Sequence, residues 1–141
     1  MDWQFSNETL KDGKLVTYLF LKTNFTQEKY LTLIRPEYRK LICRLRVSAH
    51  RLLIELGRYN NIPRTERICK NCILNQIEDE EHFLTQCTKF TKERKELFEL
   101  ISSKVKHFTN LHDKQKLFWI LNCEDVEILN SLGKFLQVTL P

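Results

Sequence analysis

The chain has 141 residues, of which 42% are hydrophobic and 29% charged, and its net charge is +5. This composition is ordinary for a soluble globular protein, and the length suits one domain that buries about 68–70% of its unfolded surface. The apolar run 15–21 is too short to span a bilayer, and the first residues lack the features of a signal peptide. We therefore expect one domain, 1–141, without a membrane segment, in an intracellular protein of the nucleus or cytoplasm.

The N-terminal part of the chain, 1–34, is predicted to be a helical segment. Residues 15–21 are ambiguous, because their β-branched and aromatic side chains permit a strand and their number permits a helix. We favour the helix, because the rest of the chain is predicted to be helical. Residues 26–33 look like a short helix that stops before Pro36.

A long amphipathic helix is predicted over residues 35–57. Pro36 suits a first helical turn, where its missing N–H costs nothing. Apolar residues then recur at threes and fours from Tyr38 to Leu56, and Gly57 is expected to end the helix in the left-handed conformation. The other faces of this helix carry Arg39, Lys40, Arg44, Arg46, His50 and Arg51.

Positive charge is concentrated between Arg35 and Arg58. This stretch holds seven Arg or Lys residues against Glu37 and Glu55, a net charge of +5. A charged helix face is usually only a solvated face, but such faces mix both signs and this one does not. We therefore predict contacts to the backbone of RNA or DNA from those six side chains of the helix, together with Arg58 and Arg64 of the basic loop that follows.

Four side chains that ligate metals fall within nineteen residues after this loop: Cys69, Cys72, His82 and Cys87, spaced C-x2-C-x9-H-x4-C. Structural zinc sites have four tetrahedral thiolate or imidazole ligands. Five residues turn an ideal helix by about 500°, so His82 and Cys87 reach one ion only if the helix of His82 ends near Gln86. We predict one structural Zn²⁺ in a knuckle, 58–88, made of a turn or hairpin, a short helix and a helix end.

Other interpretations of these four residues stay open. A redox dithiol would need a thioredoxin-like setting, whereas Cys69 follows a loop. A zinc deaminase would need H-x-E ahead of P-C-x-x-C, whereas here C-x-x-C comes first. The plainest alternative is a set of unliganded core cysteines with a hydrogen-bonded histidine. The five cysteines are an odd number, which favours a reducing compartment over disulfides, and Cys43 and Cys123 are expected to be half-buried.

The rest of the chain, 89–141, is predicted to form C-terminal helices. Four acidic residues, Glu78-Asp79-Glu80-Glu81, stand where the helix of His82 would begin and suit the N-terminal end of its dipole. Further helices are expected over 89–104, over 114–121 and after Asp125, the last with Gly133 inside it. The expected fold is therefore mainly α, a single helical domain with a small zinc knuckle inserted between helices.

No catalytic pattern accompanies the metal pattern. The three glycines are isolated, so there is no Gly-rich phosphate loop, and no serine elbow or pair of aspartates for a two-metal site is present. We therefore expect a binding protein rather than an enzyme. A second hypothesis is a protein-interaction adaptor that presents apolar surface from the helices over 89–106 and 126–136.

Three strings of the sequence follow a specific pattern: RLRVSAHRLLIELGR (44–58), IPRTERICKNC (62–72) and IEDEEHFLTQC (77–87). They contain R-x-S-x-H, G-R, P-x-x-x-R-x-C-x-x-C and E-D-E-x-H-F-L-x-x-C. In these features the chain resembles, over about residues 40–100, the region that follows the polymerase in animal non-LTR retrotransposon reverse transcriptases.

The resemblance implies a zinc knuckle that grips template RNA or target DNA while a polymerase acts. It carries over the metal ligands Cys69, Cys72, His82 and Cys87, and the contacts Arg44, Arg46, His50, Arg51 and Arg58. The polymerase's Y/F-x-D-D motif and a restriction-like endonuclease signature are absent. The chain therefore looks like a detached C-terminal piece, either a gene derived from a retroelement or a folded remnant without a selected function.

Overall fold

A computed structural model describes residues 16–22 and 28–141 of the chain. The described part is one mainly α-helical domain, which confirms the predicted fold class. The β-structure within these described residues is an isolated antiparallel bridge between Ile68 and Ile77. Its α-helices are α2 (Val16–Leu21), α3 (Tyr30–Leu33), α4 (Pro36–Arg46), α5 (Leu53–Tyr59), α6 (Thr91–Lys104), α7 (Asp113–Leu121) and α8 (Val126–Thr139). Shorter helical turns cover Arg64–Glu66, His82–Gln86, Thr88–Phe90 and Phe108–Asn110.

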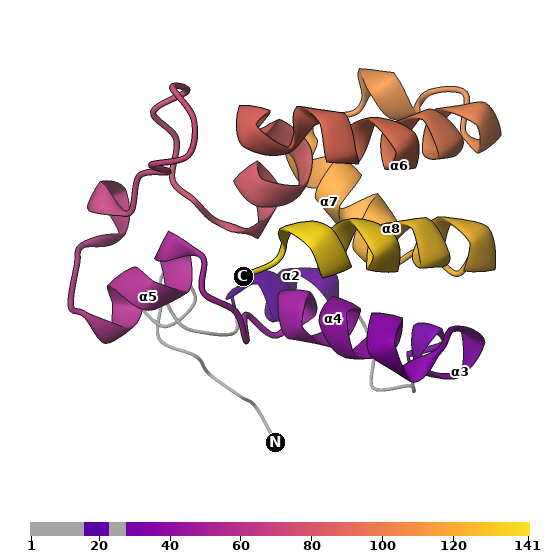
Figure 1. Cartoon of the computed structure of the whole chain (residues 1–141), viewed down its shortest axis with the longest axis horizontal. Coiled ribbons are helices and arrows are strands. Elements are labelled where there is room, and N and C mark those ends of the chain that lie inside the picture. The colour runs from indigo at the N-terminus through magenta and orange to yellow at the C-terminus, as the bar shows by residue number, and fades with distance from the viewer. Residues whose placement is uncertain (1–15, 23–27) are drawn as a thin grey trace.

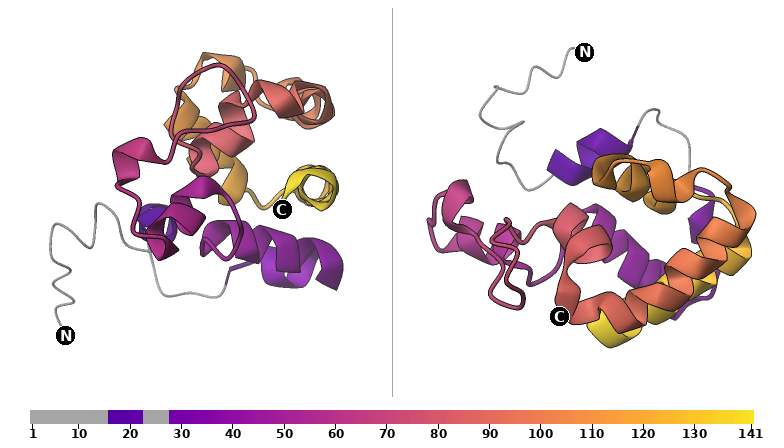
Figure 2. Two further views of the ribbon diagram at one scale, coloured as in Figure 1. Left: turned by 60° about the vertical axis from the view of Figure 1, so that its left-hand side comes forward. Right: turned by 90° about the horizontal axis from the view of Figure 1, so that it is seen from above.

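Three helices, α4, α8 and α6, lie side by side and form the main body of the domain, with α8 in the middle (Figure 1). α8 is amphipathic, and its buried face includes Leu132 and Leu136, which are fully buried. Ile42 of α4 and Ile101 of α6 are also fully buried and belong to the same hydrophobic core. α2 and α7 contact each other beside this row of helices, as the further views show (Figure 2).

The close packing of α4 on α8 depends on a glycine. A Cβ atom at Gly133 would overlap the ring carbons of Tyr38. Gly133 lies in the helix interior, where glycine is otherwise unfavourable, and its absent side chain makes room for the tyrosine. The glycine therefore marks a helix–helix contact.

The predicted helix over 35–57 is wrong, because the chain breaks it into α4 and α5. Between them Ser48 adopts a left-handed backbone conformation, with φ of 59°. Arg44 accepts from the Ala49 N–H through its carbonyl and donates to the Ala49 carbonyl from Nε, which closes the turn. Gly57 is not a left-handed end residue: it lies inside α5, and a Cβ there would overlap the side chain of Arg67.

The N-terminal predictions are confirmed where the structure describes the chain. The apolar run is a helix from Val16 to Leu21 and not a strand, and a short helix over Tyr30–Leu33 precedes Pro36. Residues 1–15 and 23–27, which include parts of both predictions, lie outside the described residues. Every helix in the described part is too short or too polar to cross a bilayer.

The segment between α4 and the turn at His82 extends to one end of the molecule, on the left of Figure 1. It holds α5, the turn Arg64–Glu66 and a loop that is closed by the Ile68–Ile77 bridge. We call residues 68–77 the cysteine loop, because they contain Cys69 and Cys72. This loop and the turn that follows it bring the four predicted ligands together.

Candidate metal centre

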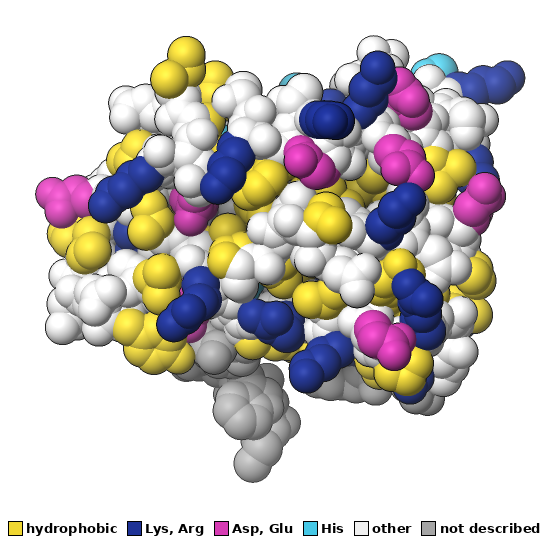
Figure 3. Space-filling model, in the orientation of Figure 1, with side chains coloured by type: hydrophobic (Ala, Val, Ile, Leu, Met, Phe, Trp, Pro, Cys, Tyr) yellow, Lys and Arg dark blue, Asp and Glu magenta, His cyan; other side chains and the backbone are white. Residues whose placement is uncertain are grey.

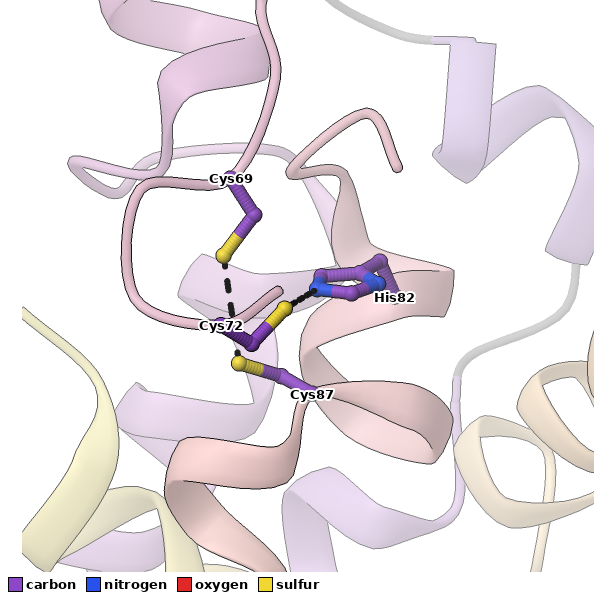
Figure 4. Close-up of side chains that lie close together, drawn as sticks. All are labelled: Cys69, Cys72, His82 and Cys87. Atoms are coloured by element: carbon purple, nitrogen blue, oxygen red, sulfur yellow. Dashed lines mark hydrogen bonds between the residues drawn. The ribbon is translucent and has the colours of Figure 1, made fainter. Parts of the chain in front are cut away.

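The four predicted ligands converge on one point (Figure 4). Cys69, Cys72, His82 and Cys87 place their ligand atoms within 4.8 Å of one another. The sulfurs of Cys69 and Cys87 are 3.9 Å apart, and the Cys72 sulfur is 3.4 Å from Nε2 of His82. Since His82 is only 1% exposed, the cluster is shielded from solvent on that side.

These distances fit a tetrahedral ion. With Zn–S bonds of about 2.3 Å and Zn–N bonds of about 2.0–2.1 Å, a tetrahedron has S···S edges of about 3.8 Å and S···N edges of about 3.5 Å. The observed separations of 3.9 Å and 3.4 Å match both kinds of edge. Two of the separations therefore match a tetrahedral site, and all four ligand atoms lie close enough together to hold one metal ion.

The cysteine loop places its two sulfurs through a fixed backbone. The Cys69 N–H donates to the Gln76 carbonyl at 2.8 Å, and the Glu78 N–H donates to the Arg67 carbonyl at 2.9 Å. Asn75 reverses the chain between these strand-like arms in the left-handed conformation, with φ of 56°. Asparagine tolerates this conformation better than most residues, so the loop forms without a glycine.

A π-helical turn over His82–Gln86 places the other two ligands. The Cys87 N–H donates to the His82 carbonyl at 2.8 Å, a bond that spans five residues. This wider turn sets His82 and Cys87 on one side of the backbone, which an α-helix would not do. The expected arrangement, a helix that ends at Gln86 with Cys87 just beyond it, is confirmed.

Both ends of this turn are held by side chains. Oδ1 of Asp79 accepts from the His82 N–H at 2.8 Å and satisfies a free donor at the start of the turn. At the other end the buried guanidinium of Arg94 donates to the carbonyls of Phe83, Leu84 and Cys87, at 2.8–3.0 Å. Burial lowers the pKa of Arg94, but three carbonyl partners satisfy its donors.

A second layer of hydrogen bonds orients the histidine. Nδ1 of His82 lies 3.2 Å from Oε1 of Gln86, so this nitrogen carries the proton and Nε2 offers its lone pair to the metal. Nε2 of Gln86 donates in turn to Asp113 at the start of α7, at 2.9 Å. Gln86 and Asp113 therefore fix the orientation of the imidazole.

The thiols differ in how readily they ionise. Burial raises the pKa of Cys69 to about 12 and raises that of Cys87 as well. At Cys72 burial acts in the same direction, but hydrogen bonds from the Leu74 backbone, Cys69 and His82 outweigh it and lower the pKa to about 7. A metal that binds at neutral pH must therefore displace protons, so affinity rises with pH.

Two buried carboxylates join the cysteine loop to the segment after α4. Glu78 accepts from the Leu53 N–H at 2.8 Å and from Asn71 Nδ2 at 3.0 Å, and it lies 3.3 Å from the Cys69 sulfur. Glu80 accepts from Ser48 at 2.5 Å and from His50 at 2.8 Å. The prediction that these acids stand where a helix begins is confirmed for Asp79, Glu80 and Glu81, of which Glu80 and Glu81 are its first helical residues, whereas Glu78 lies before the helix.

The eight predicted nucleic-acid contacts do not form one exposed face. Arg46 is fully buried, because it donates to the Leu121 carbonyl and to Glu28, the latter at 2.9 Å. His50 is buried against Glu80, and its Nδ1 accepts from the Leu52 N–H at 3.3 Å. The expectation of an exposed side chain is therefore wrong at these two positions, since both bind other parts of the chain.

The other six cations reach solvent to different degrees. Lys40 and Arg51 are exposed, and the half-buried ones are Arg39, Arg44, Arg58 and Arg64. Figure 3 shows several Lys and Arg side chains over α4 and the turn after it, with acidic side chains beside them, and over α6 the two signs alternate. The positive charge of this stretch is only partly exposed, because Arg46 and His50 are buried.

Sequence reasoning missed the side chains that support the ligands. Arg94 lies at helical spacing between the apolar residues Phe90 and Leu97. A charged residue on the apolar face of a predicted helix could have indicated that Arg94 is buried and hydrogen-bonded. Gln86 and Asp113 left no comparable signal, because their contact depends on how α7 packs against the turn of His82. Cys43 and Cys123 are half-buried, as predicted.

Comparisons of the chain with models of protein families, with curated proteins and with solved structures find no match. The resemblance to retrotransposon reverse transcriptases thus stays a prediction. The metal cluster and the surface charge are the features from which a function can be inferred.

Proposed function

We propose that the chain is a zinc-stabilised module that binds the phosphate backbone of RNA or DNA. One observation carries this proposal: cations from two separate parts of the chain, the segment between α4 and α5 and the turn after Cys87, lie beside the metal cluster. Arg51 and Lys89 line a groove of about 480 Å³ together with Asn71 of the cysteine loop. The metal would fix the loop that forms one wall of this groove.

Zinc is the ion that the donor set favours. Three thiolates and one imidazole in a closed tetrahedron are typical of structural zinc sites, whereas Mg²⁺ and Ca²⁺ prefer oxygen ligands. The role of the ion is structural, because the four protein ligands leave no open position for a substrate.

The groove is lined by charges of both signs, the cations Arg51 and Lys89 and the acids Glu78 and Glu93. The two cations can bind phosphates, and both oxygens of Glu78 already accept hydrogen bonds, from Leu53 and Asn71. Lys40 extends the positive surface along α4, where it is exposed. Contacts of this kind supply affinity without sequence preference, and they weaken as salt replaces the released counterions. The likeness of residues 44–87 to the post-polymerase region of the reverse transcriptases supports the same function.

A salt titration tests the proposal. Zinc-loaded protein is titrated against labelled single-stranded RNA and duplex DNA, with the double variant Lys40→Glu/Arg51→Glu. We expect log Kd to rise with log salt by about 0.7–0.9 for each phosphate contacted. The double variant should bind at least ten times more weakly at low salt.

The matched control is Lys95→Glu/Lys134→Glu, which changes the net charge equally at two exposed positions on α6 and α8. It should bind nearly as well as the wild type. Affinity that does not depend on salt, or an equal loss in both double variants, would contradict the proposal.

A further inference from the structure

The cysteine loop ends in an apolar tip that the described part of the chain leaves uncovered. Ile73 is 96% exposed and its neighbour Leu74 is 42% exposed. The tip projects at the upper left of Figure 1, away from the row formed by α4, α8 and α6. Burial of apolar side chains is favourable, so this tip offers binding energy that the described part of the chain does not use.

The tip is also held in place. Ile73 directly follows the ligand Cys72, and Asn75 fixes the reversal of the chain just after it. The bridge between Ile68 and Ile77 closes the base of the loop. With a metal on Cys72, the tip is a short, rigid wedge rather than a mobile loop.

Two lysines lie near the tip. Residues 70–76 include Lys70, which is exposed, and no acidic residue. Nζ of Lys89 lies 3.4 Å from Oδ1 of Asn71 in the same loop, and Lys89 shares a groove with Arg51, Glu78 and Glu93. An apolar projection among cations matches one class of partner especially well, because nucleic acids enclose apolar base faces within an anionic backbone.

We propose that Ile73 and Leu74 insert between stacked bases of a duplex, RNA or DNA, whose phosphates are held by Lys70 and Lys89. This inference rests on the proposed function and adds how the nucleic acid is engaged. Apolar side chains that enter a base step unstack it and bend the duplex, and the gain is a larger contact with the protein. No base needs to be recognised by hydrogen bonds.

Fluorescence of 2-aminopurine tests this wedge, because the base brightens when it is unstacked. Zinc-loaded full-length chain is added to short RNA and DNA duplexes that carry 2-aminopurine at successive positions. We expect the wild type to raise the fluorescence. The variant Ile73→Ser/Leu74→Ser should leave it unchanged and bind about tenfold more weakly. Val126→Ser is the control, since Val126 is an apolar residue of α8 that is 43% exposed and does not line the groove.

The outcomes separate the wedge from the proposed function. If the wild type binds in a salt-dependent way but the fluorescence stays flat and the tip variant binds equally well, the wedge is wrong and the proposed function stands. If the wild type binds no nucleic acid at low salt, the proposed function fails and the wedge with it. Circular dichroism and zinc content of the tip variant should equal those of the wild type, because neither side chain packs in the core.

Discussion

Glu80 is a buried carboxylate whose ionised form is stabilised by hydrogen bonds from its neighbours. It accepts hydrogen bonds from Ser48, His50 and Thr17, the last at 3.0 Å. Burial alone would raise the pKa of Glu80, but the bonds from His50 and Ser48 outweigh it and hold the pKa below its ordinary value. Since Nδ1 of His50 accepts from the Leu52 N–H, the proton sits on Nε2 and points at Glu80. One carboxylate thus ties α2 and the turn after α4 to the turn of His82.

Replacement of Glu80 should show how much these hydrogen bonds contribute to the free energy of unfolding. Glu80→Ala leaves the donors of Ser48 and His50 buried without an acceptor, and we expect the free energy of unfolding to fall by about 3 kcal/mol at neutral pH. Urea denaturation measures this loss. The control Glu99→Ala, at an exposed position on α6, should change stability by less than about 0.5 kcal/mol.

The same link predicts a dependence on pH. The pKa of Glu80 is lower in the folded than in the unfolded chain, so its contribution is complete above the unfolded pKa and disappears as pH falls through the folded pKa. The difference in stability between the wild type and Glu80→Ala should therefore shrink below a pH of about 4. A difference that stays constant into strong acid would contradict an ionised Glu80.

Gln86 orients the imidazole of His82, a candidate metal ligand. Because Oε1 of Gln86 holds Nδ1 of the imidazole at 3.2 Å, Gln86→Leu should release the ring and weaken zinc binding by about 10–100-fold. Competition with a chelating dye measures the affinity. Gln137→Leu, at an exposed position on α8, is the matched control and should bind zinc like the wild type. Equal affinities in both variants would show that the second layer has no effect.

For the turn of His82, the spacing of the ligands in the sequence predicts where the helix ends but not its type. Four residues between His82 and Cys87 require the helix to end at Gln86, and this was predictable from helix geometry. The π-helical form of the turn was not, because it depends on contacts with Asp79 and on Arg94 from the next helix.

The break between α4 and α5 was not predictable from periodicity. Apolar residues continue at helical spacing across it, so the sequence looks like one helix of 35–57. The chain turns instead because Ser48 and His50 bind Glu80, which lies about thirty residues further on. A single-sequence pattern contains no information on such a distant partner. For the same reason His50 was expected at the surface.

Gly133 offers a test of the packing between α4 and α8. In an exposed helix interior, glycine to alanine stabilises by about 1 kcal/mol. Here we expect Gly133→Ala to destabilise by about 1–3 kcal/mol in urea denaturation, because the new methyl group overlaps Tyr38. In the double variant with Tyr38→Gly, which also removes the Cβ atom at position 38, the alanine at 133 should cost nothing further. A stabilising Gly133→Ala would contradict the close approach of the two helices.

At the scale of the whole molecule, the turn His82–Gln86 belongs both to the metal cluster and to the hydrophobic core. Phe83 and Leu84 directly follow the ligand His82, and both are buried in the core. The ring of Phe83 lies 5.7 Å from that of Phe135 on α8. Loss of the metal therefore affects α8 and is not confined to the cysteine loop.

Removal of the metal should loosen the whole domain. Structural zinc contributes about 10–16 kcal/mol of apparent binding free energy in small fingers, as much as the stability of a typical domain. We expect a strong chelator, or His82→Ala, to lower the helical signal in circular dichroism and to abolish the cooperative thermal transition. Cys123→Ala is the control for loss of a cysteine outside the cluster. Unchanged helicity without zinc would mean that the hydrophobic core folds alone.

The most direct test of the metal centre is the metal content of the purified, reduced chain, followed by replacement of zinc with Co²⁺. We predict one ion per chain and the intense visible bands of tetrahedral cobalt with thiolate ligands. In Cys87→Ser these bands should weaken and shift, whereas Cys43→Ser should leave them unchanged. A chain that binds no stoichiometric metal while all five cysteines are reduced would contradict the account, and would leave Cys69, Cys72 and Cys87 as ordinary core thiols.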